Sequence, residues 1–155
     1  MKKLISVVVL LILTLLCCSG CAENVQFYSA KIYHASIATD EGENCVYVKS
    51  VEELKSYYDS SKDGLESMKE EVFDYYKYDE DYFSNKCILF IFHRLTPGVS
   101  NEDITSISLS NNILTVKASH TGLTDNVVPI VVVIELDKKY AGTEVKFIME
   151  GRRRY

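Results

Sequence analysis

The apolar residues of the chain form one long run at the start and a series of shorter segments after it. Residues 4–16 are apolar apart from Ser6 and Thr14, and Lys2 and Lys3 precede them. A helix of this length spans only about 20 Å, which is short of the ~30 Å hydrocarbon core of a bilayer. The run is therefore typical of a signal peptide, and an uncleaved membrane anchor is the alternative.

Beyond the run, short apolar segments alternate with polar residues, as they do in strands. The residues from 87 to 92 are all apolar, which predicts a strand buried on both faces and central in its sheet. Asn111 and Asn112 tolerate the positive φ of a tight hairpin turn. Pro129 cannot donate to a ladder, so it should lie at the edge or the first pairing residue of its strand. The expected strands cover residues 25–38 (one or two strands), 45–49, 87–94, 104–118 (a hairpin), 127–136 and 144–149.

Two helices are expected between the strands at 45–49 and 87–94. Ser50 and Glu53 form a capping box, in which the Glu53 carboxylate reaches back to the Ser50 amide. A second helix is expected over 65–76, where apolar residues recur at helical spacing. Because the two strands are connected through helices, they could pair in parallel by a right-handed crossover. The buried stripe of the first helix is Val51, Leu54 and Tyr57 or Tyr58.

This order of elements predicts an α+β fold, with two helices packed on one face of a mostly antiparallel sheet. The expected organisation is a lipoprotein signal peptide at 1–20, a short tether at 21–24, a single α+β domain at 25–150 and a basic C-terminal tail at 151–155. A tether this short would keep the domain close to a membrane surface. The three arginines of the tail would be attracted to an anionic membrane, or would form a frayed end in solvent.

The apolar run ends in C-S-G-C. Cys21 follows two small residues, Ser19 and Gly20, which can lie extended in the groove of a peptidase. This arrangement resembles the bacterial lipobox, although Cys18 stands where the pattern prefers Leu, Val or Ile. The resemblance implies that Cys21 is alkylated with diacylglycerol and becomes the new N-terminus, whereas cleavage near Ala22 and release is the alternative. Two acyl chains anchor stably, so the expected location is the extracytoplasmic face of the cell membrane.

Charge and cysteine content narrow the function further. Loss of Lys2 and Lys3 with the signal changes the formal charge from −5 to −7, which argues against nucleic acid as a partner. Cys45 and Cys87 are an even pair in an exported domain, which suggests a disulfide. Two buried thiols are the alternative, because directly paired strand positions fit disulfide geometry poorly.

The part of the chain from about 46 to 146 carries a second resemblance. It rests on an acidic-aromatic segment, an apolar strand, a G-x-S loop and a hairpin, which stand here at Asp81-Tyr82-Phe83, residues 88–92, Gly98-Val99-Ser100 and residues 104–118. The order is similar to that in small lipoproteins of Gram-positive bacteria and, more remotely, in the C-terminal domain of PrcB-type subunits of bacterial protease complexes. The resemblance implies a fold and no active-site residues.

The residues that could carry chemistry are few and scattered. No nucleophile, zinc-protease or phosphate-loop motif is present in the sequence. His34, His93 and His120 lack metal-ligand spacing, so no metal or other cofactor is expected. The acidic cluster at 79–81 lacks the pattern of a calcium loop and is expected at a helix end or turn.

The sequence therefore favours a non-enzymatic lipoprotein that binds an envelope protein or peptide, such as a protease partner, through its domain. The candidate binding loops are those around residues 95–103 and 119–126, since loops on a rigid sheet commonly carry binding. Their candidate residues are Pro97, Gly98, Ser100, His120, Thr121 and Gly122. The alternative is an envelope hydrolase or metal-assisted enzyme that uses His93 or His120 with Asp103 or Asp125.

Overall fold

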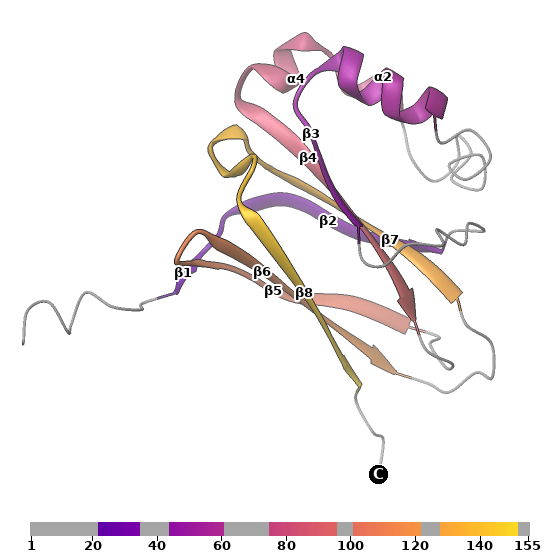
Figure 1. Cartoon of the computed structure of the whole chain (residues 1–155), viewed down its shortest axis with the longest axis vertical. Coiled ribbons are helices and arrows are strands. Elements are labelled where there is room, and N and C mark those ends of the chain that lie inside the picture. The colour runs from indigo at the N-terminus through magenta and orange to yellow at the C-terminus, as the bar shows by residue number, and fades with distance from the viewer. Residues whose placement is uncertain (1–21, 35–43, 61–74, 96–100, 122–127, 152–155) are drawn as a thin grey trace, which may run out of the picture.

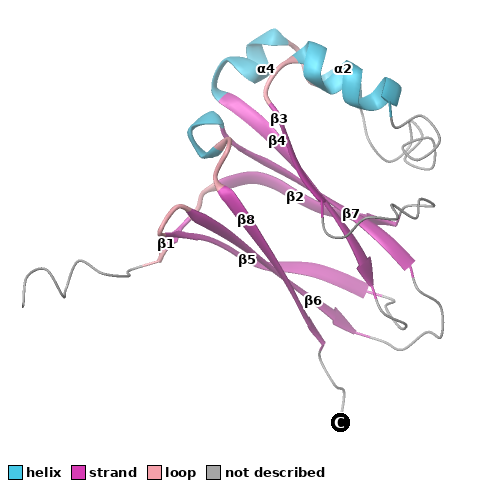
Figure 2. Cartoon of the chain, in the orientation of Figure 1, coloured by secondary structure: helices cyan, strands magenta, loops and turns pink. Residues whose placement is uncertain are grey.

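Two four-stranded sheets and a pair of helices stack in three layers (Figure 1, Figure 2). The computed structural model describes residues 22–34, 44–60, 75–95, 101–121 and 128–151. The sheet that we call the central sheet contains β2 (Phe27–His34), β7 (Val128–Asp137), β4 (Lys86–Leu95) and β3 (Asn44–Val48), in that spatial order. The outer sheet contains β1 (Glu23–Asn24), β5 (Asn101–Ser110), β6 (Ile113–Thr121) and β8 (Glu144–Gly151).

The helices cover the face of the central sheet that points away from the outer sheet. They are α2 (Val51–Ser60), α4 (Glu80–Asn85) and the 3-10 turn η2 (Tyr75–Lys77). A second 3-10 turn, η3 (Lys138–Tyr140), joins β7 to β8, and its Tyr140 packs in the core between the two sheets. Leu54 of α2 and Phe83 of α4 pack in one cluster with Val48 of β3 and Phe90 of β4. No helix within these described ranges is long and apolar enough to cross a membrane.

The core lies on both faces of β4 and β7. Each residue from Cys87 to Phe92 is at most 8% exposed, so the prediction of a central strand buried on both faces is confirmed. Leu89 and Ile91 pack toward the outer sheet, whereas Ile88 and Phe90 pack toward the helices. This alternation follows from the two-residue period of a strand, and it explains why β4 has no polar face.

The outer sheet contains the predicted hairpin. Asn111 and Asn112 have φ values of 51° and 61°, and Ser110 pairs with Ile113 across the turn, which confirms the prediction. Between Ile104 and Ser106 the register shifts by one residue. The bulge allows both Ile104 and Ile107 to reach the core in spite of their odd spacing.

Helix α2 begins as the capping residues predict. The Glu53 amide donates to Ser50 Oγ at 3.1 Å, while the Glu53 carboxylate accepts from the Lys49 amide at 2.7 Å rather than from that of Ser50. Leu54 is 1% exposed, and Val51 and Tyr57 pack beside it. The second helix that the sequence predicts, at 65–76, lies mostly outside the described residues.

Helix α4 is an element that the sequence pattern does not identify. Its first residues are acidic, and Asp79 caps it by accepting a hydrogen bond from the Tyr82 amide at 2.8 Å. The acidic cluster is thus the start of a helix, in agreement with the predicted helix end or turn. Six residues are too few to show a helical period, which explains why the pattern missed it.

The α+β class is confirmed at the coarse level, because the fold is mostly strand with helices on one face, but the strands form two sheets instead of one. The proposed parallel pairing of residues 45–49 with 87–94 is wrong. β3 and β4 are antiparallel, with Val48 opposite Ile88 and Cys45 opposite Ile91. The reason is that α4 leads directly into Lys86, so β4 starts beside the end of β3.

The start of the domain also differs from the expectation. Residues 23–24, which the sequence assigns to the tether, form β1 opposite Leu109 and Ser108. Val25 is 5% exposed, and its amide donates to the Ile107 carbonyl at 3.1 Å. Pro129 is the second residue of β7 and faces Arg94, one position before the first described pair with β2, so it lies near the strand start as predicted.

Candidate functional site

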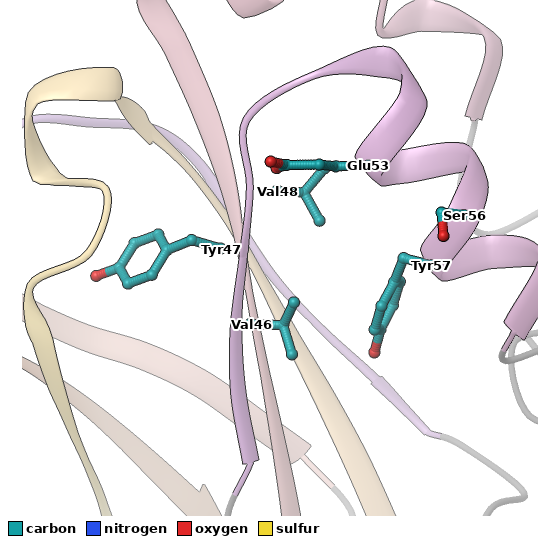
Figure 3. A pocket seen from close by; sticks show the side chains of 6 residues that line it. All are labelled: Val46, Tyr47, Val48, Glu53, Ser56 and Tyr57. Atoms are coloured by element: carbon teal, nitrogen blue, oxygen red, sulfur yellow. The ribbon is translucent and has the colours of Figure 1, made fainter.

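A groove of about 310 Å³ lies between β3 and α2 (Figure 3). Its lining is mainly apolar and includes one acid and three hydroxyl-bearing residues. In Figure 3, Val46 and Tyr57 face each other across the groove, and Ser56 lies beside Tyr57 on the helix. The lining residues are Val46, Tyr47, Val48, Glu53, Ser56 and Tyr57.

The groove has this shape because β3 is the last strand of the central sheet. Val46 and Val48 alternate on the helix-covered face, and Val48 is almost fully buried. The ring of Tyr57 stacks on Phe90 of β4, with centroids 5.1 Å apart and planes at 28°. Helix α2 therefore packs over β4 and leaves a hollow above β3, beyond which the described part of the chain has no further strand.

The edge of β3 presents backbone groups as well as side chains. Within the described ranges β3 pairs only with β4. In an antiparallel pair every second residue turns its N–H and C=O away from its partner strand. A strand edge of this kind is a template for another extended segment. Apolar side chains of the groove thus lie next to backbone groups that face away from β4, at an edge where no other described strand pairs.

The side chains around β3 are held in place from both sides. Tyr47 points away from the groove, toward β8, and its hydroxyl lies 2.7 Å from Thr143 Oγ1 (Figure 3). Burial raises the pKa of Tyr47, so the hydroxyl stays protonated for that bond at neutral pH. On the other side, the bond from the Lys49 amide to Glu53 fixes the turn from β3 into α2. The groove is preformed by these contacts.

A polar cluster around Glu135 lies on the helix-covered face of the central sheet. Glu135 of β7 is 9% exposed; its Oε1 accepts from Lys77 Nζ at 2.7 Å and from the Tyr78 hydroxyl at 3.1 Å. Burial and the Glu135 charge raise the pKa values of Tyr78 and Tyr82. The Tyr82 hydroxyl is buried close to this carboxylate, but among the described residues no group lies in standard hydrogen-bond geometry to it. These groups join η2 and α4 to β7 and give the cluster a structural role.

The predicted disulfide is absent from the structure. No disulfide joins Cys45 to Cys87. Cys45 lies opposite Ile91, four positions along β4 from Cys87, which places the two backbones about 13 Å apart. The antiparallel pairing separates them, whereas the parallel pairing would have brought them together. Burial raises the pKa of Cys87 to about 11, so the thiol is protonated at neutral pH.

The histidines are distributed over both sheets. The His93 ring, on β4, packs at 61° against Phe147 of β8, with centroids 5.0 Å apart. His120 lies on β6 of the outer sheet, between Glu102 and Gly151. His34 is the last residue of β2. Across the described segments no group of three or more His, Cys, Asp or Glu side chains could hold a metal ion.

The acids proposed to assist these histidines are not gathered with them either. Asp103 is exposed on β5, opposite Ser119 of β6, while His93 belongs to the other sheet. Asp125 lies outside the described residues. The geometry therefore adds nothing to the hydrolase alternative.

Both predicted binding loops start from one end of the molecule. Leu95 and Val128 are paired there, and so are Asn101 and Thr121. Thr121 and His120 are the last residues of β6. Four of the predicted loop residues, and the predicted lipid-attachment residue, lie outside the described part of the chain: Pro97, Gly98, Ser100, Gly122 and Cys21.

The groove residues were not among those selected from the sequence. The alternation of Val46 and Val48 and the helical stripe through Tyr57 are readable in the sequence, but they indicate burial. The edge position of β3 depends on pairing with distant strands. No family model matches the chain, and neither curated proteins nor solved structures provide a match.

Proposed function

We propose that the protein is a membrane-anchored, non-enzymatic lipoprotein that binds an extended segment of another envelope protein along β3. The observation that carries the proposal is the apolar groove beside the edge of this strand, which pairs with no described strand other than β4. A segment added to β3 gains backbone hydrogen bonds from the edge, and every second side chain would enter the groove.

The size and chemistry of the groove favour a peptide segment over a small molecule. Its volume of about 310 Å³ is at the lower limit of ligand pockets. Val46 and Tyr57 offer apolar surface for one or two side chains of the segment, while Glu53 supplies an acid at the rim. The expected segment is therefore extended, with aliphatic residues at alternate positions and a basic residue near one of them.

The anchoring part of the proposal rests on the C-S-G-C sequence and on the position of β1. Glu23 is already paired in the outer sheet, so a lipid on Cys21 would be separated from the fold by Ala22 alone. Lipidation of Cys21 would then place the domain on the extracytoplasmic face of the cell membrane. The similarity to Gram-positive lipoproteins and PrcB-type domains is compatible with such a binding role.

Site-specific crosslinking in intact cells tests the binding site. A photoreactive phenylalanine analogue at Ser56 lines the groove, and the same analogue at exposed Lys55, one residue earlier on α2, is the matched control. We expect protein adducts from position 56 and far fewer from position 55. Mass spectrometry of the adduct should place the crosslink in an extended segment with alternating aliphatic residues. Equal yields from the two positions, or adducts with lipid alone, would contradict the proposal.

A loss-of-function pair complements the crosslinking. The change Ser56→Trp fills the groove, whereas Lys55→Trp adds the same ring outside it. Binding of the partner identified by the crosslink should weaken at least tenfold, or about 1.4 kcal/mol, for the first variant only. Unchanged affinity of Ser56→Trp would exclude the groove as the binding site.

Anchoring has an independent test. The change Cys21→Ala should abolish incorporation of labelled lipid and leave the precursor unprocessed at this site. Cys18→Ala is the matched control and should retain both. Label that persists in Cys21→Ala would refute the assignment of Cys21.

A further inference from the structure

One end of the molecule gathers the first strand, the hairpin turn and η3. β1 pairs with Leu109 and Ser108, just before the turn at Asn111 and Asn112. The 3-10 turn η3 joins the end of β7 to the start of β8, and Figure 1 shows η3 and β1 on the same side of the molecule. We call this the tether end, defined by Glu23–Asn24, Phe27, Tyr28 and Lys138–Tyr140.

The tether end exposes aromatic surface. Phe27 is 42% exposed and Tyr28 is 49% exposed, and among the described residues the only other large exposed hydrophobic side chain is Tyr76. The register with β7 shifts between Phe27 and Ser29, so Tyr28 has no partner across the ladder. The bulge leaves two consecutive aromatic residues at the sheet edge, within seven positions of Cys21.

One lysine contacts the Tyr28 ring, and two more lie on η3. Lys86 Nζ lies 4.1 Å from the centroid of the Tyr28 ring, and the Tyr28 hydroxyl donates to Asp137 at 2.6 Å. Lys138 and Lys139 are exposed on η3. Glu23 is close enough to Lys139 to contribute to raising its pKa. Glu23 and Asp137 offset part of the positive charge of the lysines. The exposed aromatic rings would therefore contribute more than the lysines to the binding of this end to another surface.

We propose that the tether end lies on the membrane surface, with Phe27 and Tyr28 in the headgroup region. This inference rests on the proposed lipid anchor at Cys21. Two peptide units separate Cys21 from Glu23, so the lipidated residue lies within about 7 Å of the outer sheet. Aromatic rings favour the membrane interface, and lysine stems can extend along it to reach lipid phosphates. A freely rotating domain would expose these rings to water.

The opposite end then points away from the membrane. β8 runs eight residues from Glu144 to Gly151, a rise of about 25 Å. Gly151 lies beside His120 at the end where both predicted binding loops start. Gly151, the last described residue, therefore lies far from the tether end, and the arginines expected in the tail lie outside the described residues. The groove at β3 lies on the flank and remains accessible to a protein in the same membrane.

Photocrosslinking to lipid tests this orientation on the full-length protein in vesicles prepared from the producing cells. A photoreactive phenylalanine analogue replaces Phe27, and the same analogue at Asp103, exposed at the start of β5, is the matched control. Replacement of Lys139 provides a second probe of the tether end should position 27 affect folding. Retention of each variant in the vesicles after a high-salt wash is measured in parallel.

We expect phospholipid adducts from positions 27 and 139 at several times the yield from position 103. Equal yields in protein that the vesicles retain would overturn the orientation and leave the anchor standing. Protein that washes off the vesicles would instead refute the anchor, and with it the orientation. The two failures are therefore distinguishable.

Discussion

Removing one hydroxyl from Tyr78 or from Tyr82 should have different effects on stability. The two rings contact each other edge to face, with centroids 4.8 Å apart, and both lie beside Glu135. The Tyr78 hydroxyl donates to Glu135 Oε1 at 3.1 Å. The Tyr82 hydroxyl is also buried near Glu135, but within the described part of the chain it makes no hydrogen bond of standard geometry. Tyr78→Phe and Tyr82→Phe therefore each delete one hydroxyl oxygen beside Glu135. Only the Tyr78 hydroxyl donates a hydrogen bond of standard geometry to that carboxylate.

The magnitudes follow from what each hydroxyl contributes. A hydrogen bond to a charged group is worth about 1.5–3 kcal/mol, so Tyr78→Phe should lower the free energy of unfolding by about 2 kcal/mol. For a domain of this size that corresponds to a fall of roughly 6 °C in Tm. Tyr82→Phe removes a buried polar group without a hydrogen bond of standard geometry, which should leave stability unchanged or raise it by up to about 1 kcal/mol.

Urea unfolding of detergent-solubilised protein at neutral pH, followed by circular dichroism, measures both variants. A double-mutant cycle with Glu135→Gln identifies the source of the effect, because the cost of Tyr78→Phe should shrink when the acceptor loses its charge. Equal destabilisation by the two tyrosine changes, or a larger cost for Tyr82→Phe, would refute the reasoning about this cluster.

Three further predictions concern pH, thiol chemistry and the hairpin turn. Burial raises the pKa values of Tyr33, Tyr78 and Tyr82 in the folded state. Above about pH 10 the folded state therefore binds more protons than the unfolded state, and the free energy of unfolding should fall by at most ~1.4 kcal/mol per pH unit for each tyrosine. Urea titrations between pH 9 and about pH 11 measure this fall, and its absence would contradict the prediction. Cys87, with no exposed area and a pKa of about 11, should react with a thiol reagent at pH 8 only after unfolding, and prompt labelling of the native protein would contradict its placement. Asn112→Val should lower the free energy of unfolding by about 1–2 kcal/mol, because Asn112 has a φ of 61° that a β-branched residue disfavours. The control Asn112→Gly should be nearly neutral. Similar melting temperatures for the two variants would argue against the turn geometry.

The elements that the sequence predicts correctly are those specified by neighbouring residues. The paired asparagines determine the hairpin turn, Ser50 determines where α2 begins, and the unbroken apolar run of β4 predicts its central position. Each of these signals acts within a few residues, through allowed φ angles, capping hydrogen bonds or burial on both faces.

The features that the sequence does not predict depend on distant partners. Nothing in residues 23–24 indicates pairing with β5, whose partner residues lie more than eighty positions later. Apolar strands do not specify which of two sheets they join, so the single predicted sheet became two. The same limit applies to the groove. Val46 and Val48 indicate a buried face, whereas the position of β3 at the edge of the four described strands of its sheet results from the order of all four.

Sheet order also has a consequence for how the chain is made. β2, near the start of the domain, pairs with β7, and Phe27 lies opposite Leu136, more than one hundred residues later. A nascent chain that ends before β7 therefore contains β2 and β4 without the strand that separates them. The central sheet can close only after residues 128–137 have emerged, and such long-range pairing slows folding. Until β7 has been made, β2 and β4 therefore remain without the strand that buries them, although β3 can already pair with β4 and β5 with β6.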